Sequence, residues 1–157
     1  MLVKKYLLLF IILSCCANPL STSDSDIPKT NFVNSEDVLA EILDSYKNYS
    51  KNPEKSIDVI WNFAHPSNKE VTGPKDNFER MLLLDPYSSI LDLKEYSITK
   101  TIETENNDHY KIKILAKNNS YFEVTWVFQL DECPENPAKN CWLTIAVTAP
   151  SYYESGV

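Results

Sequence analysis

The spacing of apolar side chains changes once along the chain, which divides it into a helical and a strand-forming part. From Asn34 onward apolar residues recur every three or four positions, first in residues 38–46, then in 57–64 and in 78–82. This period is typical of amphipathic helices. Asn34 and the Asn-Pro pair at 52–53 suit helix N-termini. The sequence therefore predicts helices over about 34–46, 52–65 and 75–84.

Prolines and a glycine set the expected ends of these helices. Pro66 is expected to end the second helix after His65, because proline does not continue an α-helix. Val-Thr-Gly-Pro at 71–74 predicts a turn or a very short strand. Pro86 should end the third helix, with one further helical turn expected at 87–91.

Beyond Asp92 the apolar period shortens to two, as in strands with one buried face. This alternation runs through residues 96–102, 110–114, 122–130 and 143–149. Polar segments separate these runs at hairpin lengths, at residues 106–108, 118–119 and 134–140. Helices followed by four sequential strands predict an α+β domain over 34–150, with helices packed on one face of a four-stranded antiparallel sheet. Residues 151–157 are expected to form a C-terminal tail.

The first residues are expected to form an export signal rather than part of the fold. Two lysines precede an apolar run at 6–13, which is too short to span a membrane but typical of a signal-peptide core. Ile-Leu-Ser-Cys at 12–15 resembles a bacterial lipobox, which implies cleavage after residue 14 and acylation of Cys15. Residues 15–33 would then be the lipid-attachment cysteine and a flexible tether. The alternative is cleavage after Ala17, which would release a soluble secreted or periplasmic protein.

Composition restricts the partners of the protein. The 157-residue chain carries 15 Lys plus Arg against 22 Asp plus Glu, a formal net charge of −7. This charge argues against a nucleic acid partner and predicts repulsion from anionic lipids, so that membrane attachment depends on the lipid anchor alone. Gly73 and Gly156 are the only glycines, which excludes a Gly-rich phosphate-binding loop. No cofactor is expected.

Cys133 and Cys141 bracket the predicted loop between the last two strands. In an exported protein, two cysteines at the ends of one hairpin are candidates for a disulfide. A zinc site is disfavoured, because the spacing is wrong and neither His65 nor His109 lies near in the sequence. The cysteine pattern therefore predicts a disulfide and no metal.

The central segment resembles a known family. Val-Ile-Trp-Asn-Phe-Ala-His-Pro-Ser-Asn-Lys at 59–69 is followed by Thr-Gly-Pro at 72–74, Asn-Phe at 77–78 and Pro-Tyr at 86–87. This order is similar to that of an uncharacterised family of bacterial and plant domains in the cone-shaped nuclear transport factor two-like, or cystatin-like, superfamily. The resemblance covers about residues 36–150. It implies a cone of helices and curved sheet, and no established activity.

The resemblance also implies where a site would lie, inside the cone between the helices and the sheet. Aromatic residues are the candidates for lining such a pocket: Trp61, Phe63, Tyr87 and Trp126. Simple core packing is the alternative for these rings. Acid–base candidates for the cavity are Tyr87 again and four charged or titratable residues: His65, Asp76, Arg80 and Asp92. None of them matches an enzyme constellation of the superfamily, so no catalytic residue is assigned.

The leading hypothesis is an exported, lipid-anchored, non-enzymatic binding or interaction module, whose partner is a small hydrophobic ligand or another protein. The first alternative is a small-molecule isomerase or dehydratase that uses the cone cavity. The second is a structural module of the cell envelope, a homodimer that buries Tyr121, Thr125 and Val127 on the outer face of the sheet.

Overall fold

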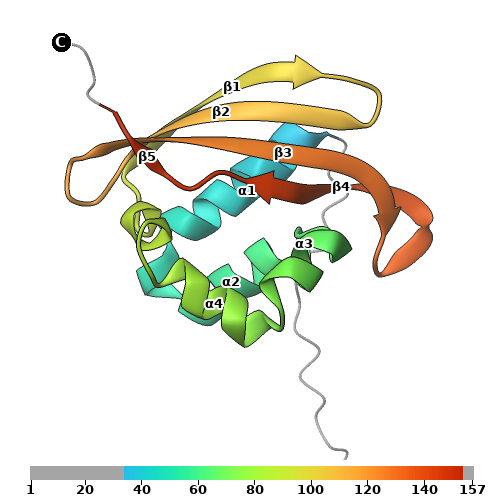
Figure 1. The fold of residues 1–157 in the computed structure, drawn as a ribbon, viewed down its shortest axis with the longest axis horizontal. Coiled ribbons are helices and arrows are strands. Elements are labelled where there is room, and N and C mark those ends of the chain that lie inside the picture. Colours follow the sequence, from blue (N-terminus) through green and yellow to red (C-terminus); the bar gives the residue numbers. More distant parts are fainter. Residues whose placement is uncertain (1–33, 154–157) are drawn as a thin grey trace, which may run out of the picture.

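The computed structural model describes residues 34–153, in which four α-helices pack against a curved antiparallel sheet (Figure 1). The predicted α+β class, with helices preceding a four-stranded meander, is confirmed. The expected signal peptide at 1–14, Cys15 and the tether at 15–33 lie outside the described residues, as does most of the expected C-terminal tail.

The helical part comprises α1 (Ser35–Lys47), α2 (Pro53–Asn62), α3 (Pro66–Thr72) and α4 (Lys75–Leu82). Two short 3-10 helices accompany them, η1 (Tyr49–Lys51) and η2 (Tyr87–Ile90). The helix α1 begins where Asn34 predicts it, because the Asn34 side chain accepts a hydrogen bond from the Asp37 N–H at 2.9 Å.

Helix α3 was not predicted: residues 71 and 72 of the expected turn or short strand form its last turn, and only Gly73 and Pro74 connect it to α4. The second helix ends at Asn62, before the expected end at His65, because Ala64 leaves the helix to form a bridge with Thr144 of β4. Pro66 does not end α2 but begins α3, at a position where proline costs no hydrogen bond. His65 caps this new helix, since its side chain accepts from the Ser67 N–H at 3.1 Å. The pattern missed α3 because its residues are mostly polar and none of them is buried.

The sheet has the order β1 (Glu95–Glu103), β2 (Asn107–Leu115), β3 (Tyr121–Cys133) and β4 (Asn136–Val147), with every neighbouring pair antiparallel. A fifth strand, β5 (Ser151–Tyr152), pairs with the start of β3. The expected tail therefore begins as part of the sheet. The predicted loop at 134–140 is also much shorter, because β4 already begins at Asn136.

Two irregularities in the pairing move side chains away from the faces that strict alternation predicts. A shift between Lys100 and Ile102 in β1 leaves Ile102 47% exposed rather than on the inner face. A shift in the β3–β4 pairing places Thr144 opposite Phe128. Thr144 is consequently buried, at 3% exposure, although alternation assigned the inner face of β4 to its neighbour Ile145.

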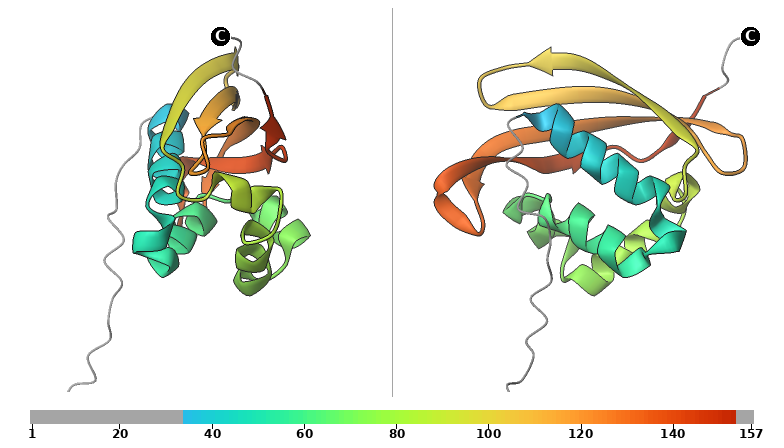
Figure 2. Two further views of the ribbon diagram at one scale, coloured as in Figure 1. Left: turned by 90° about the vertical axis from the view of Figure 1, so that its left-hand side faces the viewer. Right: turned by 180° about the vertical axis from the view of Figure 1, so that it is seen from behind.

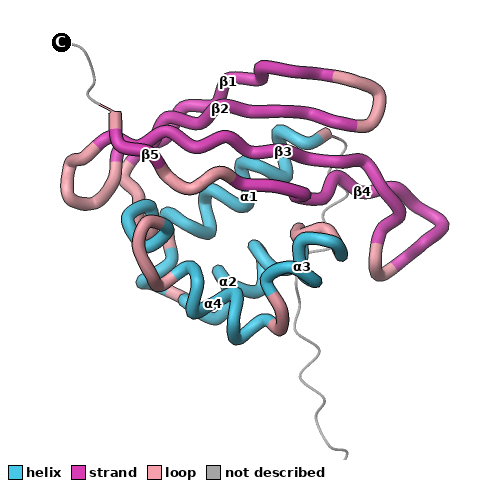
Figure 3. The backbone as a smooth tube through the Cα atoms, viewed as in Figure 1, coloured by secondary structure: helices cyan, strands magenta, loops and turns pink. Residues whose placement is uncertain are grey.

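The core lies between the concave face of the sheet and α1, which runs directly beneath it (Figure 2). The other helices form a further layer on the same side of the sheet (Figure 3). Buried residues of α1, α2, β2 and β3 make up most of the core: Val38, Leu39, Ile42, Leu43, Ile57, Ile60, Tyr110, Ile112, Ile114, Val124, Trp126 and Phe128.

Cys133 and Cys141 are joined by a disulfide across the β3–β4 hairpin, with their Cα atoms 5.0 Å apart. Such a bond persists in an oxidising compartment, which indicates an extracytoplasmic location for the domain. Over residues 34–153, no helix is both long enough and apolar enough to cross a membrane.

Candidate functional site

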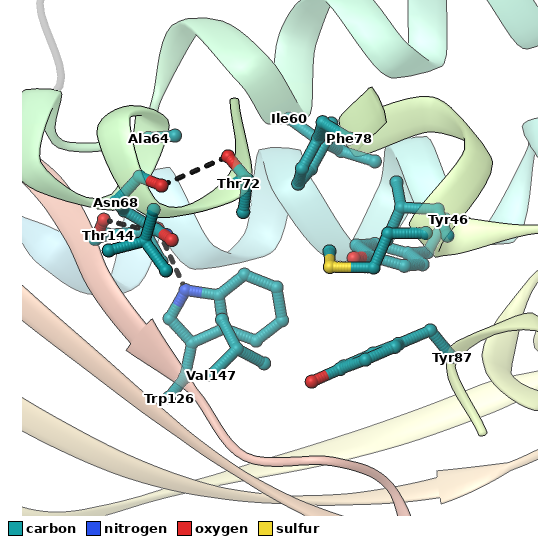
Figure 4. A pocket seen from close by; sticks show the side chains of 13 residues that line it. Tyr46, Ile60, Ala64, Asn68, Thr72, Phe78, Tyr87, Trp126, Thr144 and Val147 are labelled. Carbon is teal, nitrogen blue, oxygen red and sulfur yellow. Dashed lines mark hydrogen bonds between the residues drawn. The ribbon is translucent and has the colours of Figure 1, made fainter. Parts of the chain in front are cut away.

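A pocket of about 220 Å³ opens between the inner face of the sheet and the helices α2, α3 and α4 (Figure 4). An apolar cavity of about 150 Å³ is large enough for benzene, so this pocket can hold a molecule of one or two small rings. Its lining is dominated by aliphatic and aromatic side chains: Tyr46, Ile60, Ala64, Asn68, Val71, Thr72, Phe78, Met81, Leu82, Tyr87, Trp126, Thr144 and Val147.

Helical spacing explains why three short segments contribute most of this lining. The lining residues recur at intervals of three or four positions at 68, 71 and 72 in α3 and at 78, 81 and 82 in α4, while Ile60 of α2 is joined by Ala64 just beyond the end of that helix. Residues at this spacing share one face of a helix. Each segment therefore presents one face to the same cavity, and the sheet closes it from the other side.

The turn between α3 and α4 depends on Gly73. This residue ends α3 with a φ of +79°, a conformation that side chains rarely adopt. A Cβ at this position would also lie 2.9 Å from Nδ2 of Asn77. Gly73 thus permits the tight connection that sets α4 beside α3 at the pocket.

Trp126 forms the floor of the pocket and is held there by two contacts. It is 1% exposed, and its indole N–H donates to the Thr144 hydroxyl at 2.9 Å. The ring of Tyr46 meets it edge-on, with ring centres 6.1 Å apart. Thr144 is itself fixed to the loop after α2, since its N–H donates to the Phe63 carbonyl at 2.7 Å and its carbonyl accepts from the His65 N–H at 2.9 Å.

The pocket has two polar regions at opposite sides (Figure 4). On one side, Thr72 donates to the carbonyl of Asn68 at 3.0 Å, and the amide of Asn68 lies 3.4 Å from the Thr144 carbonyl. On the other side, the hydroxyls of Tyr46 and Tyr87 point into the cavity. Burial, and secondarily the nearby Tyr87, raise the pKa of Tyr46 well above its ordinary value, so its phenol stays neutral.

Of the four aromatic residues expected to line a pocket, the structure places Tyr87 and Trp126 in the lining and Trp61 and Phe63 outside it. Trp61 follows Ile60 by one position and therefore faces about 100° away around α2. Its ring instead packs on the ring of Phe78, with centres 5.2 Å apart, and lies beneath the ammonium group of Lys69. Phe63 follows α2 and packs against the core.

The arrangement of side chains that most resembles a catalytic site involves His65, but it lies outside the pocket. Its Nδ1 lies 2.7 Å from the Ser67 hydroxyl, and its Nε2 lies 2.9 Å from Asp131. The backbone N–H of Ser67 also donates to Nδ1, so the imidazole acts as the cap of α3. Its hydrogen bond lowers the pKa of Asp131 below the ordinary range. The three residues therefore fasten α3 to β3.

Asp92 is likewise structural. It adopts a φ of +55°, and its carboxylate accepts from the Ser50 N–H at 2.7 Å, from the Ser50 hydroxyl and from Lys117 at 3.2 Å. Burial raises its pKa, but the hydrogen bonds from Ser50 and Lys117 outweigh this effect and hold the pKa below the ordinary value. Asp76 and Arg80 are exposed on α4, where Arg80 donates to the Asn77 side chain.

Among the described residues that line the pocket, none carries a carboxylate, an imidazole or an amine. Sequence reasoning missed Tyr46, Asn68 and Thr144. Tyr46 falls on the predicted apolar stripe of α1 and could have been identified from that stripe as a residue that lines the pocket. Asn68 depends on the unpredicted α3, and Thr144 depends on the shifted pairing of β4.

No family model matches the chain, and no curated protein is significantly similar to it.

Proposed function

We propose that this protein is an exported binding module that holds a small, uncharged and largely apolar molecule in the pocket between its helices and its sheet. The observation that carries this proposal is the lining, in which apolar and aromatic walls surround a few fixed polar groups. That combination is typical of small-molecule sites: the apolar surface supplies affinity and the polar groups set orientation.

The lining also indicates the charge of the ligand. A buried ion without a partner of opposite charge is strongly disfavoured. Because no charged side chain contributes to the described lining, a neutral molecule fits best. The same feature favours binding over catalysis: an isomerase or dehydratase needs a positioned base, and His65, which directly follows the lining residue Ala64, uses its imidazole to cap α3.

The cellular setting of the proposal is the outside of the cytoplasmic membrane. The Cys133–Cys141 disulfide supports an oxidising compartment. Acylation of Cys15 and a tether over residues 15–33 would keep the domain close to a lipid surface. A curved sheet wrapped over helices supports the resemblance to the nuclear transport factor two-like superfamily. Enzymes of that superfamily work inside the corresponding cone, between helices and sheet.

The outer face of the sheet does not favour the homodimer alternative. Lys111 and Glu123 form an ion pair across that face at 3.1 Å, and Tyr121 packs on the ring of Tyr153. These side chains already have partners within one chain. A solvated, charged face of this kind is a poor match for a permanent subunit interface, which is depleted in charge.

Native mass spectrometry of the protein purified from its own membranes tests the proposal. The test variant is Thr72→Phe, which places a ring in the pocket and removes a hydroxyl bonded only within α3. The matched control is Thr99→Phe, the same change at an exposed position of β1. We expect a small neutral molecule on the wild-type protein and the control, and none on Thr72→Phe. Equal occupancy in Thr72→Phe, or no bound molecule in any of the three, would contradict the proposal.

The same preparation, measured under denaturing conditions, tests the anchor. An added diacyl or triacyl mass on a chain that begins at Cys15 is expected. An unmodified chain that begins at Asn18 would show soluble export instead.

A further inference from the structure

The phenol hydroxyls of Tyr46 and Tyr87 are the polar groups in the otherwise apolar half of the pocket. Tyr46 is 3% exposed at the end of α1, and Tyr87 is half-buried in η2. Within residues 34–153, neither hydroxyl has a hydrogen-bond partner, although the hydroxyls of Tyr96 and Tyr110 both have one. Both residues line the pocket, and neither hydroxyl is sealed off from it, so each can donate a hydrogen bond to a ligand.

The Tyr46 ring is also held in place before any ligand binds, and the Tyr87 ring packs against the core. The ring of Tyr46 lies edge-on to Trp126 at an interplanar angle of 86°, and Trp126 is fixed by its hydrogen bond to Thr144. Figure 4 shows the Tyr87 ring extending across the cavity with its hydroxyl directed toward Trp126. Donors that are already oriented cost less conformational entropy on binding than mobile ones.

From this geometry we infer that Tyr46 and Tyr87 bind an acceptor oxygen of the ligand, which is a small neutral carbonyl compound with an apolar ring body. This inference rests on the proposed function and specifies its ligand class. A carbonyl oxygen has two lone pairs and can accept from both hydroxyls. On the same side of the pocket, Phe78, Met81 and Ile60 offer the ring body apolar contacts.

Charge and protonation agree with a neutral acceptor. The pKa of Tyr46 is raised by burial, so its phenol remains a donor throughout the physiological range. A carboxylate ligand would need a cation, and the described lining contains none. A hydrocarbon would fit the volume but would leave both hydroxyls without a partner, at a cost in affinity.

Calorimetric titration with 1-indanone and indane tests the inference, because these two bicyclic compounds share a ring system and differ in the carbonyl group. The variants are Tyr87→Phe and Tyr46→Phe, each of which removes one hydroxyl and keeps the ring. The control is Tyr96→Phe, since the Tyr96 hydroxyl bonds to Asp44, at 3.3 Å, outside the pocket. Tyr87 is half-buried and unpaired, so its variant is expected to fold even if Tyr46→Phe does not.

We expect 1-indanone to bind the wild-type protein more tightly than indane. The ratio of the two affinities should fall by about three- to tenfold in Tyr87→Phe and in Tyr46→Phe, and it should stay unchanged in Tyr96→Phe. A ratio that none of the variants changes, with both compounds bound, would overturn the carbonyl inference and leave the proposed function standing. Failure of both compounds to bind the wild-type protein would overturn the inference and the proposed function together.

Discussion

A buried cluster outside the pocket lining ties the start of α1 to the sheet, and its carboxylate is the most informative single position in the fold. Asp108, 3% exposed on β2, accepts from the Ser35 hydroxyl and from the Lys100 ammonium at 3.1 Å. The Ser35 hydroxyl also lies 2.6 Å from that of Tyr110. Burial lowers the pKa of Lys100, but its hydrogen bonds with Asp108 and Tyr110 raise it above the ordinary value.

We expect Asp108→Asn to lower the free energy of unfolding by about 2–3 kcal/mol. Breaking a buried ion pair by removing one partner costs roughly 3–5 kcal/mol. Two features reduce this figure here. Lys100 is 27% exposed and keeps a second carboxylate, that of Glu103, at 3.4 Å. One carboxylate oxygen of Asp108 is buried without a partner among the described residues, and its charge is removed by the substitution.

Urea denaturation followed by tryptophan fluorescence measures this loss. The matched control is Asp131→Asn, which removes the same charge from a 44% exposed carboxylate bonded to His65. An exposed pair contributes at most about 1 kcal/mol, so the control should remain close to the wild-type protein. If Asp108→Asn and Asp131→Asn lower the free energy of unfolding by the same amount, the reasoning from burial is refuted.

Three further changes have defined outcomes. Thr144→Val should lower the free energy of unfolding by about 1–3 kcal/mol in urea denaturation, because it leaves the buried indole N–H of Trp126 without an acceptor; an unchanged midpoint would contradict that role. Replacing both Cys133 and Cys141 by Ala should lower the free energy of unfolding by about 2.5 kcal/mol, as expected for a cross-link of sequence separation 8. A reducing agent should then lower the free energy of unfolding of the wild-type protein only. Asp92→Asn should cost stability at neutral pH. Since the folded-state pKa of Asp92 is depressed, its contribution is complete above the unfolded value of about 4 and disappears as the pH falls through the folded value. Chemical denaturation from pH 7 to pH 3 should therefore show the wild-type and variant curves converging, and parallel curves would rule this out.

The sequence was sufficient for the class and order of elements wherever apolar periodicity is strong. The stripe of α1 and the alternation of β2 and β3 are buried as predicted, because each of these elements has one face against the core. Helix α3 escaped prediction because it buries none of its residues and is held by side-chain capping and by contacts with β3 and β4. Such contacts join residues that are distant in the sequence and leave no periodic signal.

The candidate site could be predicted only in part, for a related reason. Trp126 and Tyr87 were identified as bulky aromatic residues, but the same argument wrongly included Trp61, which faces Phe78 rather than the cavity. Thr144 reaches the pocket only because the pairing register shifts between Val127 and Phe128. Asp108 was expected in a polar turn, whereas β2 begins one residue before it and α1 covers it. Register and helix placement are tertiary properties, and single-residue patterns do not contain them.

Thermal unfolding in the presence of 1-indanone tests the central claim most directly, because only a molecule that binds the folded protein raises its midpoint. At a ligand concentration of 100 times Kd the folded state gains about 2.7 kcal/mol, which corresponds to a rise of about 5–10 °C for a chain of this size. We expect that rise for the wild-type protein and for Thr99→Phe, and no rise for Thr72→Phe, whose added ring occupies the pocket. An equal rise in all three proteins would place the binding elsewhere, and no rise in the wild-type protein would contradict the account.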